Sequence, residues 1–176
     1  MKTLAIFDFD ATLYNSPLPT DENRELLEVY RGYKSSGWWG RSESLDIDLF
    51  DIRPNPWTLE RYNDHKKKGD KLALMTGRIF KIKESVRKVI SQDGFTFDDQ
   101  LYADGRRTID FKLDMLEKFA NSGKYNEIYF YDDRTEHIPA FRKAGDKYKD
   151  ELGIDFKLFH VIGHTGYELK YGKKLR

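Results

Sequence analysis

The amino-acid sequence predicts an α/β fold, a three-layer sandwich built on a central parallel sheet of about five strands. Five short apolar runs have the length and composition of buried strands, and they cover residues 4–7, 71–75, 101–103, 128–131 and 156–162. The segments between them include stretches with apolar residues at helical spacing. Strands that alternate with helices pair in parallel through right-handed crossovers, which brings their carboxyl ends to one edge of the sheet.

The composition agrees with one soluble globular domain. The chain has 176 residues, of which 39% are hydrophobic and 35% charged, so it can bury a core. Its formal net charge of +1 favours neither a nucleic-acid-binding polycation nor an acidic scaffold. It contains no cysteine, which excludes disulfides, thiolate metal sites and a thiol nucleophile. We expect a single domain over residues 1–176, with a small insertion at about residues 14–68.

The sequence predicts a cytoplasmic protein. The N-terminus enters the first apolar run directly, without the charged region and long apolar stretch of a signal peptide. No apolar run approaches the length that spans a membrane. We therefore expect no membrane partner, and no obligate protein partner is evident.

The first predicted strand delivers two carboxylates to the carboxyl edge of the sheet. Asp8 follows the run at residues 4–7 directly, and Asp10 stands two residues further on. Crowded carboxylates repel one another, so such a pair is usually maintained by a bound cation, a shared proton or a reaction that needs both. The alternative is that the two residues only end the strand and cap a turn.

The insertion after this strand contains two predicted helices and an aromatic loop. Thr20 is expected to cap the first helix, and Asn55 the second, which has Pro56 at its first position. The loop between them carries Trp38 and Trp39. Two adjacent tryptophans cannot both enter one core from a regular element, so we expect one to be buried and the other partly exposed. Packing of the loop and stacking on a substrate both remain open.

The later strands and helices bring further polar residues to the same edge. Lys112 falls in the first turn of a predicted helix, where a cation opposes the helix dipole unless an anion lies in front of it. The last helix is expected to end at Gly145. The tail after Gly163 is expected to be a solvated end or an anion-attracting flap, because it carries Tyr167, Lys170, Tyr171, Lys173, Lys174 and Arg176. The polar residues at the edge are Thr76, Gly77, Arg78, Lys112, Asp132, Asp133 and Arg134.

These motifs, in this order, resemble the haloacid dehalogenase-like (HAD) superfamily of phosphohydrolases. Its DxDx[TV] motif matches Asp8, Asp10 and Thr12. Its strand-ending Thr or Ser, its Lys and its paired acids match Thr76, Lys112, Asp132 and Asp133. The resemblance implies a Rossmann-like fold in which the insertion forms a small cap, and a small cap leaves the site open to large substrates.

The resemblance also assigns chemical roles. Asp8 would be the nucleophile that forms an aspartyl-phosphate, and Asp10 would protonate the leaving group and then activate water. Thr12 would orient Asp10 or the loop, and Lys112 would pair with the nucleophile and the phosphoryl group. Mg²⁺ is the implied cofactor because it suits an all-oxygen site. Its ligands would be Asp8, the backbone carbonyl of Asp10 and either Asp132 or Asp133.

The phosphate and the rest of the substrate would meet a second set of residues. Thr76 would donate to a phosphate oxygen, with backbone N–H groups around Gly77. Arg134 would bind substrate or lock the acidic pair. Two departures from the family pattern are Ala11, where many members have Gly, and His137, where many have an acid. His137 would contact the phosphate or serve as a core or capping residue. The substrate-binding candidates are Thr12, Thr76, Gly77, Arg78, Arg134, His137, Trp38 and Trp39.

A narrower set of motifs is similar to the HAD domain of Swiss Army Knife RNA-repair proteins. These motifs are residues 8–13, Gly37-Trp38-Trp39, residues 74–78, Phe111-Lys112, and residues 131–134 with His137. The similarity implies phosphate removal at polynucleotide ends. Basic residues would then track a backbone or form an ordinary solvated face: Lys66, Lys67, Lys68, Lys81, Lys83, Arg87, Lys88, Arg106 and Arg107. The alternatives are a phosphatase for nucleotides or other small phosphometabolites, and a HAD module that binds nucleic acid without turnover.

Overall fold

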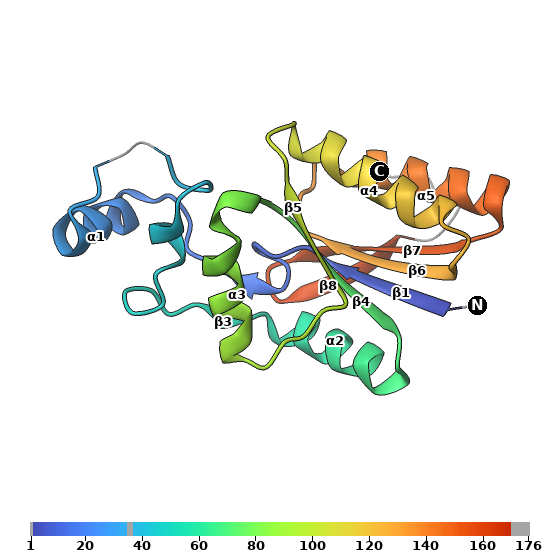
Figure 1. Cartoon of the computed structure of the whole chain (residues 1–176), viewed down its shortest axis with the longest axis horizontal. Helices are drawn as coiled ribbons and strands as arrows, with labels where there is room; N and C mark the ends of the chain where they lie inside the picture. The colour runs from blue at the N-terminus through green and yellow to red at the C-terminus, as the bar shows by residue number, and fades with distance from the viewer. Residues whose placement is uncertain (1, 35–36, 170–176) are drawn as a thin grey trace.

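The computed structural model describes residues 2–34 and 37–169, and within them a six-stranded sheet forms the centre of the molecule (Figure 1). The strand order is β5-β4-β1-β6-β7-β8. The first five of these run parallel, and β8 is antiparallel to β7. The α/β fold class is confirmed, with one strand more than expected. The bounds are β1 Lys2–Phe7, β4 Lys71–Ile79, β5 Asp99–Ala103, β6 Tyr125–Asp132, β7 Asp155–Ile162 and β8 Thr165–Leu169.

Helices cover both faces of this sheet, which makes the three layers visible in Figure 1. Leu4 and Ile6 of β1 enter the core beneath α4 and α5, whereas Ala5 and Phe7 enter the core beneath α2 and α3. The central strand is therefore buried on both sides, as its unbroken apolar run predicts. The helices are α2 Pro56–Lys68, α3 Lys83–Gln92, α4 Thr108–Asn121 and α5 Ile138–Leu152.

Strand register brings the ends of β1, β4 and β6 to one edge. Phe7 lies opposite both Leu74 of β4 and Tyr131 of β6. The backbone N–H of Asp8 donates to the carbonyl of Tyr131 at 3.0 Å, so the chain leaves β1 beside the end of β6. The polar residues that follow the three strands consequently converge, as the crossover rule predicts.

The insertion forms α1 (Asp21–Arg31), the short 3-10 helix η1 (Ser42–Leu45) and the ribbon of β2 (Tyr14–Asn15) with β3 (Arg53–Pro54). The expected caps are present, since Thr20 accepts from the N–H of Asn23 and Asn55 from that of Trp57. In Figure 1, α1 projects from the side of the sandwich, whereas α2 lies against the sheet. The segment that projects beside the sheet edge therefore ends before α2.

Helix α5 is longer than the sequence indicates. It continues through Gly145 and ends at Gly153, whose φ of 68° lies in the left-handed region that favours glycine. Gly145 is a packing residue, because a Cβ there would lie 2.2 Å from Cδ1 of Phe156. The expected end at Gly145 is wrong for that reason: the glycine makes room for a ring and does not break the helix.

The segment after Gly163 forms β8 at the edge of the sheet. Tyr167 pairs with His160 of β7 and is 56% exposed, so this part of the tail is a solvent-exposed edge strand and not a flap. The other tail residues, Lys170, Tyr171, Lys173, Lys174 and Arg176, lie outside the described residues. None of the helices in the described ranges combines the length and apolar character that a membrane crossing requires.

Candidate active site

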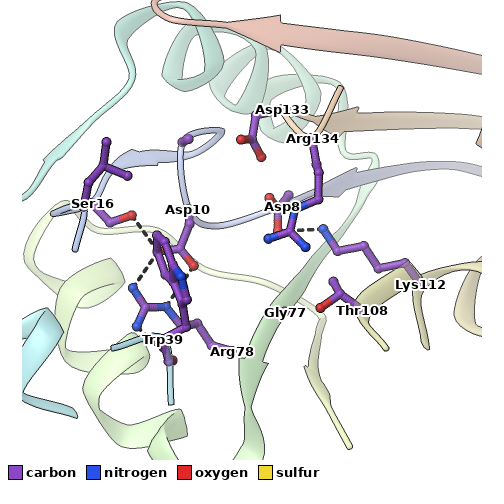
Figure 2. A pocket seen from close by; sticks show the side chains of 12 residues that line it. Asp8, Asp10, Ser16, Trp39, Gly77, Arg78, Thr108, Lys112, Asp133 and Arg134 are labelled. Carbon is purple, nitrogen blue, oxygen red and sulfur yellow. Dashed lines mark hydrogen bonds and ion pairs between the residues drawn. The ribbon is translucent and has the colours of Figure 1, made fainter. Parts of the chain in front are cut away.

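A buried lysine joins two carboxylates at the carboxyl edge of the sheet, and Figure 2 shows its contact with one of them, Asp8. Nζ of Lys112 lies 2.8 Å from Oδ1 of Asp8 and 2.6 Å from Oδ2 of Asp132. All three side chains are buried. Asp8 follows β1, Asp132 ends β6, and Lys112 is the fifth residue of α4. The lysine therefore has the anionic partners that its unfavourable place on the helix dipole predicts.

Asp133 completes an acidic group with Asp8 and Asp132. One oxygen from each of the three lies within 4.8 Å of the others, a spacing that suits a hard divalent cation. The two acids of β6 differ in their partners. Asp132 is fully buried, and its oxygens accept from Lys112 and from the backbone N–H of Arg134. Asp133 instead lines the pocket.

Burial and crowding oppose ionisation of Asp8 and Asp133. Burial raises the pKa of Asp8 well above its usual range, against the attraction of Lys112, and the neighbouring carboxylates raise it further. Burial, followed by the charge of Asp132, also raises the pKa of Asp133. Burial alone would lower the pKa of Lys112, but Asp132 and Asp8 raise it above its usual value. Three carboxylates face one lysine, so a bound cation would offset the negative charge that remains when all three ionise.

The loop after β1 turns sharply to hold Thr12 beside these acids. Ala11 has a φ of 55°, in the left-handed region where many HAD sequences have Gly. The hydroxyl of Thr12 lies 3.5 Å from Oδ2 of Asp8 and 3.4 Å from Oδ1 of Asp133. Both distances are long for O–H···O hydrogen bonds. Thr12 is therefore placed to orient the acids, while Asp10 is held by other residues.

Asp10 is hydrogen-bonded by Arg78, which lies beyond the end of the apolar run in β4. Nε and Nη2 of Arg78 donate to the two oxygens of Asp10 at 2.9 and 2.8 Å. Its Nη1 donates to Oγ of Ser44 at 2.7 Å and to the carbonyl of Trp39 at 3.0 Å. Ser16 donates to Oδ1 of Asp10 at 2.5 Å. Arg78 is only 1% exposed, so the structure uses it to connect Asp10 with the insertion.

The end of β4 presents backbone, rather than a hydroxyl, to the pocket. Oγ1 of the buried Thr76 accepts from the N–H of Arg78 at 3.0 Å and closes the turn. Gly77 lines the pocket beside Thr108, the first residue of α4. A Cβ at Gly77 would lie 3.0 Å from Cγ2 of Thr108, so a side chain there would crowd the helix start. Ser16, Leu18 and Thr108 line the pocket without having been found in the sequence, because no motif marks them.

The two tryptophans divide as expected, one inside and one outside. Trp38 is 3% exposed, and its Nε1 donates to the carbonyl of Pro17. Trp39 is 41% exposed and lines a pocket of about 420 Å³. Arg134 lines the same pocket, and its Nε lies 3.7 Å from Glu136.

The ring of His137 lies beside that of Phe141. His137 is the N-cap residue of α5, but its side chain makes no capping hydrogen bond. Its Nδ1 is buried without a hydrogen-bond partner among the described residues. Burial, and then the charge of Arg134, lower its pKa. It is absent from the pocket lining, which favours the core role over phosphate contact.

The basic residues proposed to track a backbone are largely neutralised or far from the pocket. Arg106 pairs with Asp104 and Asp114, and Arg107 with Asp110. The three lysines at residues 66–68 end α2 just before β4 begins, which places them at the opposite edge of the sheet. Charge pairing therefore favours the solvated-face interpretation.

Comparison with known proteins identifies the family. A family model described as HAD domain family 1 in Swiss Army Knife RNA repair proteins matches residues 13–168. The match begins after Asp8 and Asp10, so their place at the site comes from the structure. Because the match covers most of the chain, it supports phosphatase-type chemistry at the level of the family.

Solved structures agree on the fold. A chain in the structure of the Pnkp1/Rnl/Hen1 complex has a TM-score of 0.55 and 19% identity, covering 92% of this chain and 45% of that one. A second, from the Pnkp1/Rnl/Hen1 RNA repair complex, has 0.54 and 20%, covering 91% and 42%. This chain thus spans less than half of those chains. A HAD-superfamily hydrolase from Ehrlichia chaffeensis has 0.50 and 18%, covering 82% and 86%. The chain belongs to the HAD domain family 1 found in Swiss Army Knife RNA repair proteins.

Proposed function

We propose that the protein is a Mg²⁺-dependent phosphohydrolase that works through an aspartyl-phosphate and removes a terminal phosphate from a polynucleotide. The observation that carries the chemistry is the buried bridge from Lys112 to Asp8 and Asp132, with Asp133 beside it. The polynucleotide substrate is supported by the family description alone.

Asp8 is the proposed nucleophile. Its carboxylate oxygen attacks phosphorus, the bond from phosphorus to the ester oxygen breaks, and the electron pair leaves with that oxygen. Asp10 supplies a proton to the leaving oxygen and then, as a carboxylate, takes one from the attacking water. Water attack returns inorganic phosphate and free Asp8. The charge of Lys112 lowers the pKa of Asp8 against burial, which raises it, and so favours the ionised nucleophile.

The residues present fit a magnesium ion. The donor set is all oxygen, and its three carboxylates converge. Asp8, Asp133 and the backbone carbonyl of Asp10 would hold the ion, whereas both oxygens of Asp132 already have partners. When bound, the ion would neutralise the charge of the site and of the phosphoryl group.

The start of α4 is the proposed phosphate cradle. A helix N-terminus offers backbone N–H groups and a positive dipole end to an anion. Thr108 of α4, Gly77 and Arg134 all line the pocket beside Asp8. Thr76 is buried and absent from the pocket lining, so it acts through the turn in which its Oγ1 accepts from the N–H of Arg78.

The test is a phosphate-release panel with the purified chain and Mg²⁺. End-phosphorylated oligonucleotides, mononucleotides and sugar phosphates are compared with wild type and Asp8→Asn. We expect release from end-phosphorylated oligonucleotides. Asp8→Asn should abolish turnover while circular dichroism stays unchanged. Wild-type turnover by Asp8→Asn would overturn the covalent mechanism, and a preference for sugar phosphates would favour a small-metabolite phosphatase.

A further inference from the structure

Trp39 is an aromatic side chain that the proposed chemistry does not use. It lines the pocket that holds Asp8, yet it is 41% exposed. Leaving so much of a tryptophan in water forgoes burial that would otherwise stabilise the fold. Its neighbour Trp38 is only 3% exposed, so the loop itself can bury an indole.

The indole of Trp39 is held in place from behind. The guanidinium carbon of Arg78 lies over its ring, 4.9 Å from the centroid, and Nη1 of Arg78 binds its carbonyl. Figure 2 shows the ring at the side of the pocket occupied by Asp10 and Ser16. The guanidinium lies over the ring, and the exposed 41% of Trp39 is the surface that a stacking partner could use.

A second apolar side chain shares the pocket. Leu18 is 55% exposed and also belongs to the lining. The acids lie deeper: Asp8 is buried, while Trp39 and Leu18 remain open to water. The pocket thus has the acidic site at its base and apolar side chains at its opening.

We propose that Trp39, with Leu18, forms a nucleobase subsite, and that the enzyme recognises the phosphate-bearing nucleotide itself. This inference rests on the proposed function for its placement of the phosphate at Asp8. Every base has a π-face, so stacking on an indole recognises a nucleoside without requiring a sequence. Among the described residues, Arg106 and Arg107 are paired with carboxylates, which weakens their attraction for a backbone beyond that nucleotide.

The test compares a nucleoside monophosphate with ribose phosphate, which carries the phosphate without a base. Trp39→Leu keeps apolar bulk and removes the π-face, whereas Trp39→Phe keeps an aromatic face. Tyr30→Ala is the matched control, because Tyr30 is 61% exposed in the same insertion and does not line the pocket. We expect Trp39→Leu to lower kcat/KM for the nucleotide by roughly 5-fold to 100-fold.

Ribose phosphate and Trp39→Phe distinguish stacking from a structural role of Trp39. Ribose phosphate should change less than about 2-fold, and Trp39→Phe should retain most of the nucleotide preference, if stacking is the cause. Equal losses on both substrates would mean that Trp39 only supports Arg78 and the fold, and would overturn the inference. The inference would also be overturned if kcat/KM for a longer oligonucleotide were far above that for the mononucleotide and if this difference fell steeply with salt.

Binding can be measured separately from turnover. Nucleoside monophosphate should quench tryptophan fluorescence of Asp8→Asn, and Trp39→Phe in that background should remove the quench. Quenching without phosphate release in wild type would refute the proposed function and leave the base subsite standing. Phosphate release without quenching and without a preference for the base would refute the base subsite and leave the proposed function standing.

Discussion

Replacing Arg78 with lysine should separate the two halves of the proposed reaction. The guanidinium binds both oxygens of Asp10, and its third nitrogen binds Ser44 and the carbonyl of Trp39. A lysine keeps the charge but presents its donors from a single point, so it cannot hold Asp10 at both oxygens and reach the insertion as well. Asp10 would lose its fixed direction.

The size of the effect follows from these contacts. Losing about two hydrogen bonds should lower the free energy of unfolding by about 1–3 kcal/mol. That corresponds to a fall in Tm of roughly 2–4 °C per kcal/mol in a chain of this length. General base catalysis contributes about 10²-fold to 10⁴-fold, and a misdirected Asp10 should forfeit at least about 10-fold of it.

The assay is rapid mixing with p-nitrophenyl phosphate, whose leaving group needs no proton. Formation of the aspartyl-phosphate should then be nearly normal in Arg78→Lys, while its hydrolysis, which needs Asp10 as base, should be slow. We expect a burst of about one nitrophenolate per site followed by turnover reduced at least about 10-fold. Arg87→Lys is the control, because Arg87 is an exposed arginine paired with Glu84.

One result would refute this reasoning. If the first turnover slowed as much as the steady state, with a raised KM and no burst, Arg78 would be contacting the phosphate. The hydrogen bonds from Arg78 to Asp10 would then exist only in the enzyme without substrate.

Three further predictions concern the metal, pH and packing. Mg²⁺ at about 100 times its Kd should stabilise the wild type by about 2.7 kcal/mol in thermal unfolding. Asp133→Asn should lose most of that gain at the same Mg²⁺ concentration, whereas Asp132→Asn should destabilise the apo protein by leaving a buried lysine short of a partner. Burial lowers the pKa of His65 below its ordinary 6.5, so the unfolded state binds the proton first as pH falls. The stability that neutral His65 contributes is therefore complete above about pH 6.5 and decreases below it; urea unfolding from pH 7.5 to 5.5 should show a shallower decline for His65→Gln. Gly145→Ala should cost about 1–3 kcal/mol by overpacking against Phe156, seen as a lower urea midpoint; an unchanged midpoint would contradict the tight contact.

The catalytic edge could be predicted because it depends on local pattern and chain topology. An apolar run ending in Asp8, another ending before Thr76 and a third ending in Asp132 need only be paired in parallel to meet. Lys112 could be singled out because a cation near the start of a helix opposes the helix dipole and so predicts an anionic partner. These features are short-range, and the crossover rule supplies the rest.

The partners of Asp10 could not be predicted in the same way. Arg78 stands in the strand-end motif, where a phosphate contact was the simplest expectation. Ser44, which binds Arg78, and Ser16, which binds Asp10, come from an irregular insertion whose path no periodicity specifies. The division between Trp38 and Trp39 was expected, but which of them is buried depends on Pro17 across the loop. Gly145 misled because the sequence cannot show that a ring will press on it.

The insertion also shares its core with the sheet. Trp38, Leu45 and Phe50 belong to the same buried cluster as Phe7 and Leu74 of the sheet. Elements that share one core open together, so the insertion and the face of the sheet beneath α2 and α3 should form one cooperative unit in hydrogen exchange. The amides at the buried end of the insertion would then exchange with the free energy of global unfolding, and substrate would enter through the standing mouth of the pocket.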